Sequence, residues 1–292
     1  MSQYFLCRRE HRWTLYVVGT YYPLMKPRHL KSSERTSKRL PASGFPILEH
    51  DPSPLAIIEP RRVYKSIDAP KHCVLCFFQD VIDDLILNGG AREIDHAISE
   101  VGRHPVYELE FGGKRLAVAH PRVGAPMAAA MLDRCVARGM RKFIACGGAG
   151  VLDSKIAVGH IVVPTAAIRD EGTSYHYLPP AREVAPHPRA LAAIEKTLKR
   201  NGLDYIVAKT WTTDGLFRET RARMLSRKHE GCLTVEMEAA AFFAVAQFRR
   251  VQFGQILYGG DDLSARWDHR NWNRHQIRER LFALAAEACL SM

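Results

Sequence analysis

The apolar pattern changes character at about Phe45. Beyond that point, short runs rich in β-branched residues predict strands, because turn residues bound each run; they cover 55–59, 73–77, 115–120, 142–146, 160–168, 205–211 and 252–258. Segments rich in alanine and leucine with helical periodicity predict helices at 79–88, 126–139, 187–201, 237–249 and 275–290. The alternation predicts an α/β fold, a single domain with a mixed, largely parallel central sheet flanked by helices.

The first 44 residues lack this pattern and carry most of the net positive charge. Residues 1–40 hold nine lysines and arginines against two glutamates, in a chain of net charge +11. We therefore predict a basic extension over 1–44, disordered or peripheral, and a folded domain over 45–292. A nucleic-acid-binding tail is the alternative interpretation. The apolar stretch over 14–25 is too short to span a bilayer, so we expect no membrane contact and rank a targeting segment second.

The cysteines and histidines indicate no metal site. Seven cysteines lie mostly in apolar segments, as expected of reduced thiols in a cytoplasmic protein. Cys73 and Cys76 form one CxxC pair, and no second pair completes a zinc ligand set. The thirteen histidines show no HExxH spacing. The sequence predicts neither a metal nor a resident cofactor.

Two glycine clusters follow predicted strands. CGGAG covers 146–150 and YGGDD covers 258–262. In an open α/β sheet the ligand lies outside the carboxyl ends of the strands, and glycine lets the backbone approach it closely. CGGAG has neither the dinucleotide-binding nor the P-loop spacing. The clusters therefore predict a site for another kind of small molecule, although an isolated glycine pair is more often a tight turn.

The octet TVEMEAAA over 234–241 places Glu236 and Glu238 around Met237, just before a run of small apolar residues. Charged side chains are rarely buried without partners. One explanation is a helix first turn, where acids suit the positive end of the dipole. The other is a ligand, because the two adjacent hydroxyls of a ribose can both donate to one carboxylate.

Together these segments resemble the nucleoside phosphorylase family, which includes uridine phosphorylase, bacterial purine nucleoside phosphorylase and methylthioadenosine nucleosidase. The resemblance runs from about Ile57 to the C-terminus, which makes 45–292 the catalytic domain. Four segments occur in the family's order. They are the glycine-rich strand end over 143–150, the segment RDEGTSYH over 169–176, the triplet Glu236–Met237–Glu238, and Asp261, 23 residues after Glu238.

The resemblance implies a role for each matching residue near the sugar and the leaving base. Glu238 binds the ribose 2′- and 3′-hydroxyls, Met237 packs on the sugar, and Glu236 either contacts the substrate or supports the segment. Asp261 protonates the leaving base, unless GDD is only a turn. Asp261 favours a purine, whereas RDEGTSYH resembles the uridine branch, so the base stays open.

Further positions are implied on the base and phosphate sides. Gly147 and Arg169 match base-binding positions, and Phe217 is an aromatic candidate for stacking on the base. Gly148 occupies a phosphate-binding position, and Arg62 falls in register with the arginine of the family's phosphate loop.

The chain departs from the family's phosphate-binding pattern. Ala145 replaces an arginine, and Gly148 replaces a residue with a hydroxyl. The resemblance implies cleavage of the N-glycosidic bond of a nucleoside, with transfer of the pentose to an acceptor. Positive charge is available from Arg62, Arg122 and Arg169, so phosphate is the preferred acceptor, which gives a pentose 1-phosphate. Water is the alternative acceptor. A nucleoside-binding protein without turnover is a further alternative. The expected partners are a nucleoside, phosphate and other copies of the chain, in a dimer, trimer or hexamer, and no nucleic acid.

Overall fold

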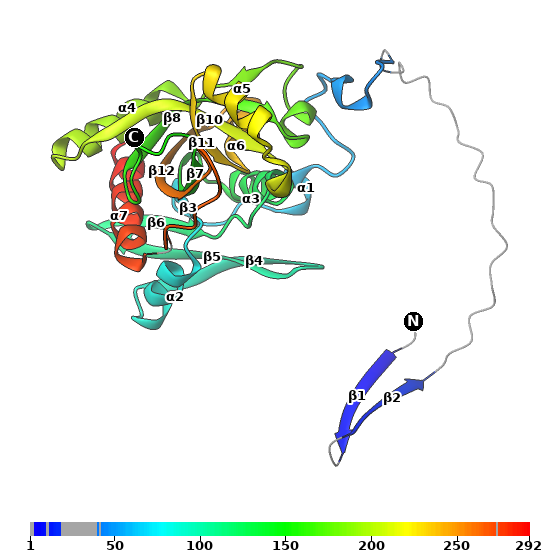
Figure 1. The fold of residues 1–292 in the computed structure, drawn as a ribbon. Helices are drawn as coiled ribbons and strands as arrows, with labels where there is room; N and C mark the ends of the chain where they lie inside the picture. The colour runs from blue at the N-terminus through cyan, green and yellow to red at the C-terminus, as the bar shows by residue number, and fades with distance from the viewer. Residues whose placement is uncertain (1–2, 10–11, 19–39, 41, 273) are drawn as a thin grey trace. The chain divides into compact units, whose positions relative to one another are not determined.

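The computed structural model describes residues 3–9, 12–18, 40, 42–272 and 274–292, which divide into two units (Figure 1). The first unit ends at Arg39 and contains β1 (Gln3–Arg9) and β2 (Arg12–Val18), which pair antiparallel. This strand pair was not predicted. The rest of the predicted extension over 1–44 lies largely outside the described residues, so its proposed disorder stays a prediction.

The second unit, Leu40–Met292, contains a ten-stranded sheet. Its strands are β3 (His72–Cys76), β4 (Ala91–Ser99), β5 (Gly102–Phe111), β6 (Lys114–Ala119), β7 (Lys142–Val151), β8 (Ile161–Asp170), β9 (Glu183–Val184), β10 (Tyr205–Thr213), β11 (Cys232–Glu236) and β12 (Gln252–Asp262). The order is β11-β10-β8-β12-β7-β3-β6-β5-β4, with β9 on β8. β11 also pairs with β7, so β7, β12, β8, β10 and β11 close into a barrel.

Strand direction is mixed, as predicted. β7 pairs in parallel with β3 and β12, and β10 pairs in parallel with β8 and β11. β4, β5 and β6 form an antiparallel extension, and β8 meets β12 antiparallel over a short stretch. The carboxyl ends of β7 and β12 therefore lie side by side, which brings the two glycine clusters together.

Helices cover both faces of the sheet (Figure 1). They are α1 (Pro60–Val63), α2 (Gln79–Leu87), α3 (Ala125–Arg138), α4 (Pro188–Arg200), α5 (Arg221–His229), α6 (Ala239–Arg249) and α7 (His275–Ser291). Successive strand residues point to opposite faces, so Leu75 and Phe143 pack with α3 and α6, while Val74 and Ile144 pack with α4 and α7. Each such buried side chain contributes about 1.5–3 kcal/mol.

The predicted strand over 55–59 is wrong. No strand forms there; Leu55, Ile57 and Ile58 are exposed, and the segment leads into α1, which starts at Pro60. No neighbouring strand pairs with this segment, so its apolar side chains do not join the sheet. The consequence for function is that Arg62 does not follow a sheet strand.

Within the described residues, no helix is both long and apolar enough to cross a membrane. Six cysteines are buried and unpaired, namely Cys73, Cys76, Cys135, Cys146, Cys232 and Cys289. The side chain of Cys7 lies outside the description.

Candidate active site

Glu236 organises the turn from β11 into α6. One carboxylate oxygen, Oε2, accepts hydrogen bonds from the backbone N–H groups of Glu238 at 2.7 Å and Ala239 at 2.6 Å. The other oxygen, Oε1, accepts from Thr212 Oγ1 at 2.6 Å. The hydroxyl oxygen of Thr212 in turn accepts from the N–H of Ala240 at 3.0 Å. Glu236 thus satisfies N–H groups at the helix start that have no partner within the helix.

Glu238 stands on that turn and is 5% exposed. Its Oε1 accepts a hydrogen bond from the N–H of Gly124 at 2.5 Å, at the residue before α3. Burial, and next the charge of Glu236, raise the pKa of Glu238 above its ordinary value. The backbone N–H of Met237 is close enough to lower the pKa of this carboxyl group, but among the described residues no second hydrogen bond of ordinary geometry forms. One oxygen is therefore fixed by the protein and the other is free for a ligand.

A cavity of about 320 Å³ opens beside Glu238, at the carboxyl ends of β7, β11 and β12. Its volume is within the range of small-molecule sites. Predicted site residues that line it are Gly147, Gly148, Glu236, Met237, Glu238 and Asp261. The sequence analysis did not single out Phe77, Phe78, Leu216, Trp272 and Arg278, which also line it.

Asp261, and not Asp262, faces this cavity. Asp261 Oδ2 accepts a hydrogen bond from Trp267 Nε1 at 2.8 Å. Asp262 Oδ1 instead accepts from the N–H of Ser264 at 2.7 Å, inside its own loop. Gly150 leaves the room for this arrangement, because a Cβ there would lie 2.5 Å from Leu263 and 3.4 Å from Asp261 Oδ1. The second glycine cluster is thus followed by one aspartate, Asp261, whose carboxyl group faces the cavity.

Glu219 is a further acid near Asp261 that sequence reasoning missed. It follows the short 3-10 helix η3 (Leu216–Arg218), whose first residue lines the cavity. Burial, and next the charge of Asp261, raise the pKa of Glu219 to about 7. In the sequence, its place shortly after WTTDG was the only indication of a role. A single acidic residue in a predicted loop does not show whether its side chain belongs to a site or only contacts solvent.

Gly147 and Gly148 line the cavity, but aromatic rings occupy the space next to them. A Cβ at Gly147 would lie 3.1 Å from the Phe77 ring, and one at Gly148 would lie 3.2 Å from the Tyr258 ring. The missing side chains thus allow close packing of Phe77 and Tyr258 against the end of β7. That packing explains these glycines without a bound anion.

Arg278, on α7, is the one cationic side chain that lines the cavity within the described part of the chain. Its Nη1 donates to Asp80 Oδ2 at 2.9 Å, and its guanidinium lies over the rings of Phe78 and Trp272. Its Nε is buried and has no hydrogen-bond partner among the described residues. The cavity therefore combines several carboxyl groups with one arginine that is already paired.

Three predicted residues do not line the cavity. Arg62 is exposed on α1, because the strand that was expected to place it does not form. Phe217 is 94% exposed, and its neighbour Leu216 takes the place at the cavity. Arg169 is buried, but its Nε donates to Ser174 Oγ at 2.8 Å and its Nη1 to the carbonyl of Pro179 at 2.7 Å. Arg169 thus organises its own loop.

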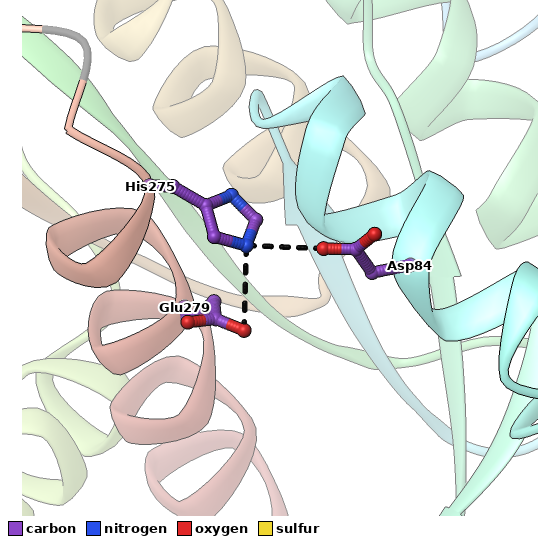
Figure 2. A group of neighbouring side chains, drawn as sticks. All are labelled: Asp84, His275 and Glu279. Atoms are coloured by element: carbon purple, nitrogen blue, oxygen red, sulfur yellow. Dashed lines mark ion pairs between the residues drawn. The ribbon is translucent and has the colours of Figure 1, made fainter.

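A separate group of metal-ligand types lies outside the cavity, where α7 meets α2 (Figure 2). His275 Nε2 lies 3.0 Å from Asp84 Oδ2 and 3.4 Å from Glu279 Oε1. His275 Nδ1 lies 3.1 Å from Asp80 Oδ2, and this hydrogen bond is the main cause that raises the pKa of His275. A protonated histidine explains these exposed contacts as ion pairs, so we assign no metal here.

Comparison with known proteins identifies the family. Residues 71–291, which include every residue that lines the cavity, match the model described as the phosphorylase superfamily. The chain belongs to this superfamily. The resemblance and the fold class predicted from the sequence are thereby confirmed.

Curated relatives include two proteins named as phosphorylases. The guanosine phosphorylase of Halorubrum lacusprofundi is 26% identical over 159 residues, which are 54% of this chain and 66% of the relative. The uridine phosphorylase of Thermococcus kodakarensis is 24% identical over 205 residues, 63% of this chain and 74% of the relative. A uridine phosphorylase of Haemophilus influenzae is matched over 64% of its length. The chain thus spans just under two thirds of the guanosine phosphorylase and of the Haemophilus enzyme.

Solved structures show the same fold. An AMP nucleosidase from Bacteroides thetaiotaomicron aligns with a TM-score of 0.62 at 22% identity, covering 76% of this chain and 87% of that one. A purine nucleoside phosphorylase from Toxoplasma gondii aligns with a TM-score of 0.66 at 15% identity, covering 77% and 92%. At these identities the likeness establishes the fold, and the reaction has to be argued from the cavity.

Proposed function

We propose that this superfamily member cleaves the N-glycosidic bond of a purine riboside, with water as the acceptor. The observation that carries the proposal is that Glu238, with one free carboxylate oxygen, and Asp261 line the same cavity. Glu238 accepts hydrogen bonds from the ribose 2′- and 3′-hydroxyls, and Met237 packs against the sugar. These contacts hold the anomeric carbon in place for attack.

Asp261 is the proposed general acid. As the bond between C1′ and N9 breaks, the sugar becomes cation-like and the base gains negative charge. Protonation at N7 by Asp261 stabilises the leaving purine. The oxygen of water bonds to C1′, and the proton that this water loses restores the acid through solvent. The products are free ribose and the base.

Water is favoured over phosphate because the described lining of the cavity offers few positively charged donors. Among the described residues, three carboxyl groups line it, from Glu236, Glu238 and Asp261, and the one arginine there is paired with Asp80. A phosphate dianion needs several charge-assisted donors to leave water. The sequence-based preference for phosphate depended on Arg62, Arg122 and Arg169, none of which lines the cavity. Because the relatives from Halorubrum lacusprofundi and Thermococcus kodakarensis are named as phosphorylases, phosphate stays the second candidate acceptor.

The identity of the sugar product tests the proposal. The purified chain is incubated with purine and pyrimidine ribosides, with and without phosphate, and the sugar is identified by mass spectrometry. We expect free ribose from purine ribosides at a rate that does not require phosphate. Ribose 1-phosphate, formed only with phosphate, would make the protein a phosphorylase. No base release from any riboside, combined with measurable riboside binding, would indicate a binding protein instead.

A matched pair of variants ties the activity to this cavity. Asp261→Asn removes the proposed acid and should lower turnover of purine ribosides at least tenfold. Asp262→Asn makes the same chemical change one residue further on, outside the cavity, and should retain most of the activity. Equal losses in both variants would place the acid elsewhere.

A further inference from the structure

A second, smaller pocket of about 170 Å³ lies between the β4–β5 hairpin, the turn over 121–124 and α3. In the part of the chain that the structure describes, its polar lining consists of Tyr64, Ser99, His104, Arg122 and Arg134, with no carboxyl group. It is separate from the cavity of Glu238, but the two meet at one turn. Val123 lines the first cavity, Arg122 lines the second pocket, and Gly124 donates to Glu238.

Arg134 is the central feature of this pocket. Its side chain is only 3% exposed, and it makes no hydrogen bond to any of the described residues. Its Nε forms an ion pair with Asp95 Oδ2 at 3.0 Å, but the two groups are not aligned as a hydrogen bond, so Nε and Nη2 are buried without a hydrogen-bond partner among the described residues. Asp95 Oδ1 already accepts from Arg138 Nη2 at 2.6 Å.

A buried guanidinium in this state is costly. Leaving a buried charged donor without a hydrogen bond costs about 1–3 kcal/mol or more. Asp95 is shared between Arg134 and Arg138, so one negative charge faces two positive ones. Two guanidinium groups next to the pocket thus share one carboxylate, which leaves an excess of positive charge there.

Arg122 is a second cationic side chain of the pocket, and its hydrogen bonds fix the orientation of His104 and Ser99. Its Nε donates to His104 Nδ1 at 3.2 Å, and its Nη2 donates to the carbonyl of Arg103 at 2.6 Å. Because Nδ1 accepts, the proton of a neutral His104 resides on Nε2, which lies 2.6 Å from Ser99 Oγ. The Ser99 hydroxyl hydrogen is then available to a ligand in the pocket.

The charge around His104 agrees with this assignment. Burial lowers the pKa of His104, and the nearby guanidinium groups of Arg122 and Arg134 lower it further. The pocket therefore has a positive potential with a neutral histidine at its wall. Arginine binds tetrahedral phosphoryl oxygens through paired N–H groups, and hydroxyl donors complement it.

We propose that this pocket binds a phosphoryl group, supplied either by inorganic phosphate or by the phosphate of a nucleotide. The proposal does not depend on the reaction in the first cavity, since it concerns binding alone. Phosphate could then affect the reaction in two ways. As a co-substrate it becomes part of the sugar product, whereas an anion bound in this second pocket would change the rate of base release without entering the product.

Binding of inorganic phosphate to the full chain tests the proposal. Isothermal titration calorimetry is performed at constant ionic strength set with chloride, so that non-specific charge effects cancel. We expect saturable binding of one phosphate, weakened at least tenfold in Arg134→Gln and in Arg122→Gln. The matched control is Arg92→Gln, on β4 of the same hairpin, where the side chain is 68% exposed and pairs with Glu108. This control should bind as the unmodified chain does.

Further variants locate the anion and guard against misfolding. Circular dichroism checks each fold, and because Arg134 is buried, Arg122→Gln and Ser99→Ala supply changes at the rim of the pocket. Arg278→Gln should leave phosphate binding intact, since Arg278 lines the other cavity. Absence of saturable binding, equal binding by the Arg92, Arg122 and Arg134 variants, or loss with Arg278→Gln alone would overturn the proposal.

A nucleotide arm distinguishes the two sources of the phosphoryl group. AMP and adenosine are titrated in parallel with phosphate. Tighter binding of AMP than of both adenosine and phosphate, abolished by Arg122→Gln, assigns the pocket to a nucleotide. Binding of phosphate with no gain of AMP over adenosine assigns it to the free anion. Both outcomes support a phosphoryl site.

Discussion

The two glutamates around Met237 differ in what occupies their oxygens. Both oxygens of Glu236 accept bonds from the protein, whereas Glu238 keeps one oxygen free at the cavity. A residue with satisfied oxygens positions its neighbours, and a residue with a free oxygen can bind a ligand. The same reasoning separates Asp261, which faces the cavity, from Asp262, which closes its own loop.

Glu238→Gln should weaken riboside turnover without disturbing the fold. Loss of a charged hydrogen-bond acceptor costs about 1.5–3 kcal/mol, which corresponds to roughly a tenfold to 150-fold loss in kcat/KM. Steady-state kinetics on the best riboside measures it. Glu183→Gln, a carboxylate-to-amide change at the exposed position of β9, is the matched control and should be neutral. Unaltered kinetics in Glu238→Gln would contradict the assignment of the ribose site.

Glu219 should make the reaction sensitive to pH near 7. Its pKa is raised to about 7, so it gains negative charge as the pH rises through that value. Negative charge near Asp261 opposes a leaving base that is itself becoming negative. We therefore expect kcat/KM to fall above about pH 7 in the unmodified chain and to fall less in Glu219→Gln. Identical pH profiles would remove Glu219 from the site.

The raised pKa of Glu219 also predicts how the stability of the chain depends on pH, which can be measured without substrate. An acid with a raised pKa binds its proton more tightly in the folded chain than in the unfolded one. Its contribution to stability is present below its ordinary value of 4.5 and is lost as the pH rises through about 7. Urea unfolding from pH 4.5 to 8 should show this loss in the unmodified chain, and Glu219→Gln should reduce it.

At the scale of elements, the junction of β11 and α6 is held by one carboxylate. Glu236 binds two backbone N–H groups of the α6 start and the hydroxyl of Thr212 on β10, so it joins two strands and a helix. Because α6 packs against the sheet over a long buried face, a disturbance at its first turn reaches the core.

Glu236→Ala should therefore lower the free energy of unfolding. It leaves two buried N–H groups and one hydroxyl without their acceptor, and we expect a loss of about 3 kcal/mol. Urea denaturation measures the loss. Glu236→Gln keeps one acceptor oxygen and should lose less. A large loss of activity in both variants with unchanged stability would instead make Glu236 a substrate ligand.

Elements with continuous apolar runs were predictable from the sequence. β3, β6, β7, β8, β10 and β12 are buried strands of this kind, and the five predicted helices form within one or two residues of their expected bounds. β4 and β5 were missed because much of their hairpin is exposed and charged. α5 was missed because its sequence is strongly polar and Met224 is its one buried residue.

The candidate site was predictable where one segment carried the information. Glu238, Met237 and Asp261 stand at the ends of predicted elements, and the structure brings them together. The roles of Arg278 and Arg134 were not predictable, because each lies on a helix outside the motifs. Only the tertiary fold places each of them at a cavity. Arg62 misled because its assignment depended on a strand that does not form.

At the scale of the whole molecule, the unit that ends at Arg39 lies outside the matched superfamily region, residues 71–291. We predict that a chain of residues 40–292 keeps its unfolding midpoint within about 2 °C and its activity within about twofold. Thermal unfolding and the riboside assay check this. An insoluble or unfolded product would show that the first unit supports the second.

The predicted self-association has a defined place to be tested. The apolar side chains of Leu55, Ile57 and Ile58 are exposed, beside a groove of about 700 Å³. Apolar exposure of this kind marks surfaces that associate. We expect light scattering to show a dimer or larger assembly, and Ile58→Asp to shift it towards smaller species. A monomer at all concentrations would contradict the prediction.

The closed barrel has a consequence for how the protein behaves at high concentration. Since β11 returns to β7, the long path of the sheet ends at a single outer strand, β4. Outer strands expose unpaired backbone groups to which other chains can add, and charged side chains discourage such addition. β4 presents the exposed polar side chains of Arg92, Glu93 and His96 within one short stretch. Replacing its exposed charges with β-branched residues would therefore turn this strand into the starting point for fibril-like stacking, while the barrel strands would remain protected.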